Sequence, residues 1–128
     1  MSVPVITDPA QLPIAFEHAL NAGDVDTVLT LFAPDAAMRT VAGEFITGTD
    51  ALRAEFGGTV AVHGTLTNVR RHTLVGAGSA LLVNDWTLEV DTPGGGRTAR
   101  TGTTANIARR DPYDGTWRFA LLNPLGTA

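Results

Sequence analysis

The sequence has 128 residues, a net charge of −4 and no cysteine, and 44% of its residues are hydrophobic. This length suits one domain spanning residues 1–128, with a core that needs no disulfide. The lack of cysteine and of lysine excludes thiolate metal sites, cysteine nucleophiles and Schiff-base chemistry on a lysine. No basic stripe is present, so we expect no nucleic acid as a partner.

The first residues, Met1–Val5, carry no positively charged region and no long apolar run, so we expect no signal peptide. No stretch of the sequence approaches the 18 continuous apolar residues of a membrane span. We therefore predict a cytoplasmic protein without a membrane partner.

Two helices joined by a tight connection are predicted first. The first helix begins either at the turn capped by Asp8, with Pro9 following, or at Pro13, and Gly23 ends it. Asp24 caps the second helix directly afterwards. Asn-Ala-Gly-Asp is thus a helix stop followed by a helix cap.

The second helix has an apolar stripe with helical spacing from Val25 to Phe32, and Pro34 ends it. A strand over 36–41 and a short strand through Phe45 and Ile46 follow. A third helix then runs from Gly48 to Gly57-Gly58.

The second half of the chain changes to the period of strands. Segments rich in threonine and β-branched residues, separated by turns rich in glycine, proline and aspartate, predict four strands at about 64–75, 80–90, 98–109 and 116–122. Helices followed by an antiparallel meander indicate an α+β fold, with three N-terminal helices packed on a curved, mostly antiparallel sheet.

Both faces of the predicted strands are partly apolar. In the second long strand, Leu82, Trp86 and Leu88 share one face, whereas Val83 and Asp85 share the other. One face must pack on the helices. An apolar second face left in water would be a large sticky patch, which predicts a homodimer built sheet to sheet.

The sequence resembles the nuclear-transport-factor-2-like superfamily, and within it the SnoaL-like and ketosteroid-isomerase-like proteins. The resemblance covers residues 10–125 and is carried by the segments 19–26, 31–36, 48–52, 114–119 and 123–124. It implies a cystatin-like cone, in which the sheet and helices enclose an apolar pocket for a small molecule. It does not imply one activity, because this fold supports both enzymes and binding proteins.

Ketosteroid isomerase uses an aspartate base with a tyrosine and a protonated aspartate as hydrogen-bond donors. The resemblance places Phe16, Thr40, and Ala105 or Asn106 at those three positions. Phe16 has no donor and Thr40 has no useful basicity near neutral pH. We therefore expect no steroid isomerase activity by that mechanism.

Asp85 is the candidate that could replace the missing base. It lies mid-strand, on the side that the resemblance turns toward the pocket, and a carboxylate in an apolar cavity can act as a general acid or base. The alternative interpretation is that Asp85 pairs with Arg100 or Arg118, or faces solvent.

Other chemistry is not supported by the residues present. The three histidines have no spacing that would complete a metal site, and serine occurs only at Ser2 and Ser79, so no metal, no cofactor and no serine nucleophile are predicted. The resemblance instead predicts pocket positions at Phe16, Met38, Thr40, Phe56, Val83 and Asn106, and we expect Phe32 and Phe45 in the core.

Two functions therefore remain open at this point. The first is a protein that binds an apolar small molecule in the cone pocket without catalysis. The second is a SnoaL-like isomerase, cyclase or hydratase that uses Asp85 as its general acid or base. A buried Asp85 beside an open cavity would favour the enzyme, and an Asp85 outside the cavity would favour the binding protein.

Overall fold

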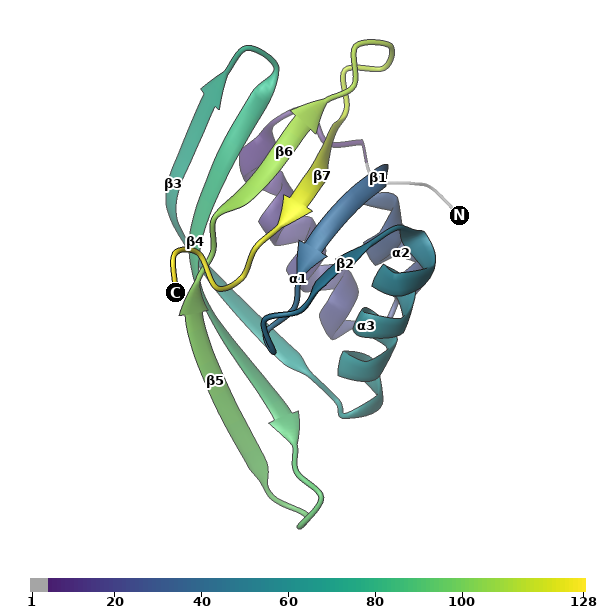
Figure 1. Cartoon of the computed structure of the whole chain (residues 1–128), viewed down its shortest axis with the longest axis vertical. Coiled ribbons are helices and arrows are strands. Elements are labelled where there is room, and N and C mark those ends of the chain that lie inside the picture. Colours follow the sequence, from purple (N-terminus) through teal and green to yellow (C-terminus); the bar gives the residue numbers. More distant parts are fainter. Residues whose placement is uncertain (1–4) are drawn as a thin grey trace.

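The computed structural model describes residues 5–128, so the expectation about Met1–Pro4 lies outside the described residues. Three helices pack on one side of a curved sheet (Figure 1). After a 3₁₀ turn at Pro9–Gln11, the helices are α1 Leu12–Asn21, α2 Val25–Thr30 and α3 Thr49–Ala61. The strands are β1 Phe32–Arg39, β2 Phe45–Thr47, β3 Thr65–Gly76, β4 Ser79–Asp91, β5 Arg97–Thr103, β6 Asn106–Arg110 and β7 Trp117–Leu122. This arrangement confirms the predicted α+β class.

The predicted caps form where the sequence places them, but two helix ends differ from the prediction. The Asp24 carboxylate accepts hydrogen bonds from the amide and hydroxyl of Thr27 and so begins α2. That helix ends at Thr30, and Phe32 already belongs to β1, because the Leu31 carbonyl accepts a hydrogen bond from Phe119 of β7. The third helix continues through both glycines at 57 and 58 to Ala61.

The sheet has the strand order β2-β1-β7-β6-β4-β3, and β5 also pairs with β4. The contact between β1 and β7 is parallel, and the other pairs are antiparallel. The C-terminal part of β4 and all of β5 form a long hairpin, which we call the arm, and its far end lies beside the end of α3, where the Asp91 amide donates to the Val62 carbonyl (Figure 1). No helix among residues 5–128 has the length and apolar character needed to cross a membrane.

The single strand predicted over 98–109 is two strands, β5 and β6, and both lie along the same edge of β4. Thr104, between them, donates its hydroxyl to the Leu82 carbonyl and accepts from the Asn84 amide with that same hydroxyl. A threonine side chain thus satisfies backbone groups where the ladder is interrupted. On either side of Thr104 the register on β4 is the same, with β6 along 79–82 and β5 along 85–91.

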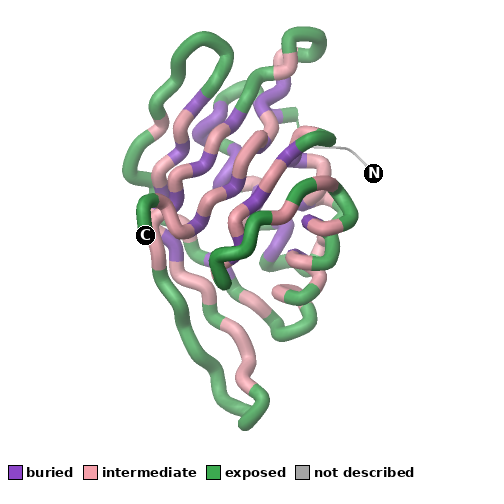
Figure 2. Tube along the Cα trace, in the orientation of Figure 1, coloured by how far each residue is buried: buried purple, intermediate pink, exposed green. Residues whose placement is uncertain are grey.

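The core lies between the helices and the sheet, where the buried segments of Figure 2 gather. Four phenylalanines pack edge to face or tilted, with ring centroids 5.1 to 6.1 Å apart, namely Phe16, Phe32, Phe56 and Phe119. Each such pair contributes about 0.5–1.5 kcal/mol beyond its buried area. Phe32 is in the core as predicted, but Phe45 is 67% exposed, because β2 is a three-residue edge strand.

Gly102 makes room for the indole of Trp86, its partner across β4 and β5. An added Cβ at Gly102 would lie 2.7 Å from the Trp86 ring, whose Nε1 donates to the Pro124 carbonyl at 2.7 Å. We predict that Gly102→Ala lowers the free energy of unfolding by about 1–3 kcal/mol, as overpacking does. Urea denaturation measures this loss.

Gly76→Ala is the matched control, since a Cβ added at that strand position meets nothing within 4 Å. It should change the stability by less than about 0.5 kcal/mol. Equal effects of the two substitutions would contradict the contact with Trp86.

Candidate functional site

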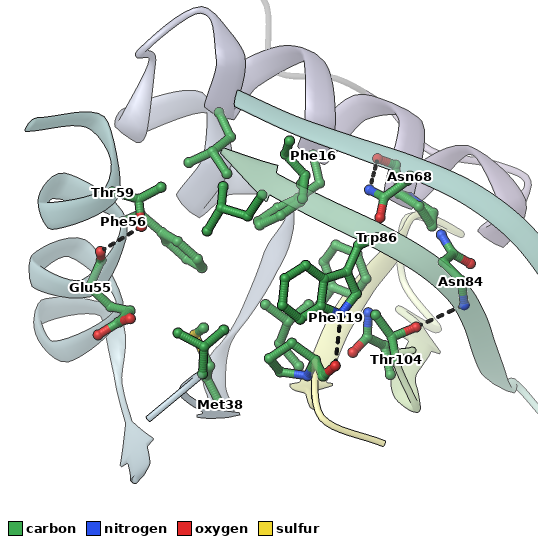
Figure 3. Close-up of a pocket in the computed structure, with 18 residues that line it drawn as sticks. Phe16, Met38, Glu55, Phe56, Thr59, Asn68, Asn84, Trp86, Thr104 and Phe119 are labelled. Carbon is green, nitrogen blue, oxygen red and sulfur yellow. Dashed lines mark hydrogen bonds between the residues drawn. The ribbon is translucent and has the colours of Figure 1, made fainter. Parts of the chain in front are cut away.

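A cavity of about 90 Å³ lies between helices α1 and α3 and the inner face of the sheet (Figure 3). Its wall is formed by Pro13, Phe16, Leu20, Met38, Val41, Glu55, Phe56, Thr59, Leu66, Asn68, Asn84, Trp86, Leu88, Thr104, Asn106, Phe119, Leu122 and Pro124. Most of these side chains are apolar, and Glu55 is the only ionisable residue among them. The cavity therefore favours an uncharged, largely apolar occupant.

The size of the cavity restricts that occupant. A dry apolar cavity of about 150 Å³ binds benzene in another protein. At about 90 Å³ this cavity is smaller, so a single ring would also occupy space at its open end.

The open end of the cavity continues into a wider hollow between α3 and the arm. Four residues line both spaces, namely Val41, Glu55, Thr59 and Leu88. The hollow has a volume of about 580 Å³ and also contacts Val62, Val90 and Arg100. We call the place where the two spaces meet, at those four shared residues, the mouth.

The opposite end of the cavity is polar. Asn68, Asn84 and Thr104 lie there in Figure 3, away from Glu55 and Met38. Asn106 extends this group from β6, where it lies opposite Leu82 of β4. The cavity thus has an apolar middle and an uncharged hydrogen-bonding end.

Of the residues predicted to line a ligand pocket, Phe16, Met38, Phe56 and Asn106 lie on the wall of this cavity. Helix α1 carries the first, strand β1 the second, helix α3 the third and strand β6 the last. The contact of each with a ligand stays a prediction.

The predicted position of Asp85 in the pocket is corrected. Its carboxylate lies on the outer face of the sheet, where it accepts a hydrogen bond from the Thr103 hydroxyl at 2.7 Å and lies 3.7 Å from Arg71. Its partner is therefore neither Arg100 nor Arg118. Val83 faces the same way, opposite His72 of β3. Side chains along a strand alternate between its two faces, and the set of β4 that faces the cavity is Asn84, Trp86 and Leu88.

Thr40 is also outside the cavity. It is buried, and its hydroxyl accepts a hydrogen bond from the Glu44 amide at 3.2 Å, while its own amide donates to the Glu44 carbonyl. Thr40 therefore closes the connection between β1 and β2 and does not line the cavity.

The inward residues that the sequence analysis did not select are Asn68, Asn84, Trp86 and Glu55. A signal for the first three was present, because the face of β4 with Leu82, Trp86 and Leu88 is the more apolar one. Burial of that face places Asn84 inside and, across the ladder, Asn68 opposite Trp86.

A second polar cluster lies near the tip of the arm, where the hairpin meets the end of α3. His63 Nδ1 and Asp91 Oδ2 are 2.6 Å apart, and Arg97 donates to the other Asp91 oxygen at 2.6 Å. Arg97 also donates to the His63 carbonyl and so joins the end of α3 to β5. Within residues 5–128, no three histidine or acidic side chains lie close enough to hold a metal ion.

The outer face of the sheet carries a row of apolar side chains in register across five strands. Leu74, Leu81, Ile107, Leu121 and Ala37 follow one another from β3 to β1. Leu74 is exposed, and the other four are half-buried. The predicted sheet-to-sheet homodimer would cover this row, and it stays a prediction.

Comparison with known proteins places this geometry in a family context. The sequence profile of the SnoaL-like domain matches residues 14–119. No curated protein matches the sequence significantly.

Solved structures with the same fold share little sequence identity with this chain. A Caulobacter vibrioides protein with a cystatin-like fold has a TM-score of 0.73 and 22% identity, with 86% of this chain and 80% of that chain covered. A candidate aromatic ring hydroxylase from Novosphingobium aromaticivorans has a TM-score of 0.78 and 19% identity, with 92% of this chain and 85% of that chain covered. A candidate dehydratase of the NTF2-like family from Streptomyces avermitilis has a TM-score of 0.73 and 16% identity, with 88% of each chain covered. At these identities the likeness establishes the fold.

The cluster of His63, Asp91 and Arg97 near the tip of the arm predicts a pH dependence of stability. The hydrogen bond with His63, and after it the one from Arg97, hold the pKa of the Asp91 carboxyl below its ordinary value. A lowered pKa stabilises the folded state above the unfolded-state pKa of about 4, and this stabilisation is lost as the pH falls through the lowered value. Asp91→Asn should therefore reduce the melting temperature at pH 7, and the gap to wild type should shrink below about pH 4.

Thermal melts at pH 7 and in the acid range measure this gap. Asp35→Asn, which removes one exposed ion pair with Arg109, is the control and should change the melting temperature little. A gap that stays constant down to about pH 3 would refute the role of the Asp91 carboxylate.

Proposed function

Because the chain belongs to the SnoaL-like domain family, we propose that it binds an uncharged, apolar small molecule in the cavity between α1, α3 and the sheet. The observation that carries this proposal is the composition of the wall, which is apolar and aromatic over most of its area, with one ionisable residue at the mouth. Burial of an anionic ligand there would lack a compensating positive charge, and Glu55 lies only at the mouth.

The function that this site supports best is binding, with no catalytic role for Asp85. Asp85 lies on the outer face of the sheet and contacts Thr103 and Arg71. A general acid or base must reach the substrate within hydrogen-bond distance, directly or through one water. The names of the hydroxylase and dehydratase neighbours describe those proteins, and a SnoaL-like isomerase, cyclase or hydratase would need a proton-transferring residue other than Asp85 here.

The mouth provides the test of binding. Leu88→Trp would place a large side chain where the cavity opens, and we expect it to weaken binding of fluorobenzene at least about tenfold, or about 1.4 kcal/mol. Titrations followed by ¹⁹F NMR measure the dissociation constant.

Thr87→Trp is the matched control, because Thr87 is the neighbouring residue of β4 and lies on the outer face. It should leave the affinity within about twofold of wild type. Equal losses in the two variants, or no binding to the wild-type protein, would overturn the proposal.

We also propose that a second copy of this chain covers the apolar row on the outer face of the sheet. The row crosses β3, β4, β6, β7 and β1 in register. Five strands at about 4.8 Å spacing give a face about 20 Å wide, and the same face of a second copy can pack on it about a two-fold axis.

Light scattering coupled to size exclusion tests this association. Ile107→Arg, in the middle of the row, should convert the dimer to a monomer, since it would bury an unpaired charge. Ile14→Arg, at an exposed apolar position on α1, should leave the mass unchanged. A monomeric wild-type protein would contradict the proposed dimer.

A further inference from the structure

The polar end of the cavity holds side-chain groups without partners. Asn84 is 3% exposed, and its backbone amide and carbonyl are both satisfied by Thr104. Among residues 5–128, no hydrogen bond joins its side-chain amide to another residue, and neither of its side-chain polar atoms is sealed from the cavity. Both the acceptor and the donor of this amide are therefore open to a group that occupies the cavity.

Asn106 presents a second unused group beside it. Its Oδ1 accepts a hydrogen bond from the Asn123 amide at 2.7 Å, which fixes the orientation of the side chain and leaves the Nδ2 donors facing the cavity. The residue is 5% exposed, and its amino group has no partner within the described chain. One acceptor and several donors are therefore available from Asn84 and Asn106 together.

The two asparagines are close enough to share one ligand group. Asn106 lies opposite Leu82 in the pairing of β6 with β4, and Asn84 follows two residues later on the same face. Diagonal neighbours of this kind have Cα atoms about 7–8 Å apart, so two amide side chains can reach one atom between them. The indole Nε1 of Trp86 does not compete, because it donates to Pro124.

We propose that Asn84 and Asn106 form a subsite for an uncharged hydroxyl group on a ring compound, a phenol or a cyclic alcohol, an inference that rests on the proposed binding function. The hydroxyl would donate to Asn84 Oδ1 and accept from Asn106 Nδ2, while the ring lies against Phe16 and Phe119. A hydroxyl matches because it both donates and accepts through one oxygen. A carboxylate does not match, because it offers only acceptors and brings a charge.

Two probes of the same shape test this subsite, namely 4-fluorophenol and 4-fluorotoluene. Titrations by ¹⁹F NMR give the ratio of their affinities in wild type and in Asn84→Leu, which keeps the size of the side chain and removes the amide. We expect the preference for the phenol over the toluene to fall about tenfold in the variant, since one or two hydrogen bonds are lost. An unchanged ratio would overturn the subsite.

Asp85→Asn is the matched control, because it changes the adjacent polar residue of β4 outside the cavity. Its affinity ratio should equal that of wild type, and a ratio that changes here and not in Asn84→Leu would also overturn the subsite. Binding of neither probe to wild type would refute the binding function itself. Binding of both probes with a ratio insensitive to Asn84 would refute only the subsite.

A second readout keeps the test valid if Asn84→Leu does not fold. In ¹H–¹⁵N spectra of the wild-type protein, 4-fluorophenol should shift the side-chain amide signals of Asn84 and Asn106 more than 4-fluorotoluene does. Equal shifts with the two probes would overturn the proposal.

Discussion

The alternation of side chains along β4 is the constraint on which the site depends. This strand pairs with β3 along one edge and with β6 and β5 along the other, so its backbone cannot rotate without breaking three ladders. Its inner face carries Leu82, Asn84, Trp86 and Leu88, which supply the cavity with an apolar wall and an amide. Because the period of a strand is two, a shift by one residue would replace that set with Leu81, Val83, Asp85 and Thr87.

Strands β5 and β6 lie along one edge of the same strand and pair with it in one register. β4 is 13 residues long, and neither β5 nor β6 alone reaches along it. Thr104 bridges the interruption by bonding the backbone of β4 at Leu82 and Asn84 with its own hydroxyl. The free arm beyond the break supplies the far wall of the hollow at the mouth, while the segment before it encloses the cavity.

The sequence was sufficient for the elements and their order, because caps such as Asp24 and the change from helical to strand period are local signals. It was not sufficient for the face of β4, since both faces contain leucine or valine and the resemblance favoured the side with Asp85. The break at Thr104 was also hidden, because Thr101, Gly102, Thr103 and Thr104 read as one continuous strand. Phe45 was placed in the core on hydrophobicity alone, although edge strands often leave such residues exposed.

The assignment of Asp85 to the outer face changes what kind of selectivity the cavity can have. A charged residue inside would select its ligand by charge, with long-range attraction and a strong dependence on protonation. Neutral amides act only at contact distance and require correct hydrogen-bond geometry. Selection then depends on whether a ligand satisfies buried donors and acceptors, because a molecule that leaves them unpaired forfeits the stabilisation that the apolar wall provides. An apolar cavity with amides at its closed end is therefore able to distinguish molecules of one shape by a single hydroxyl group.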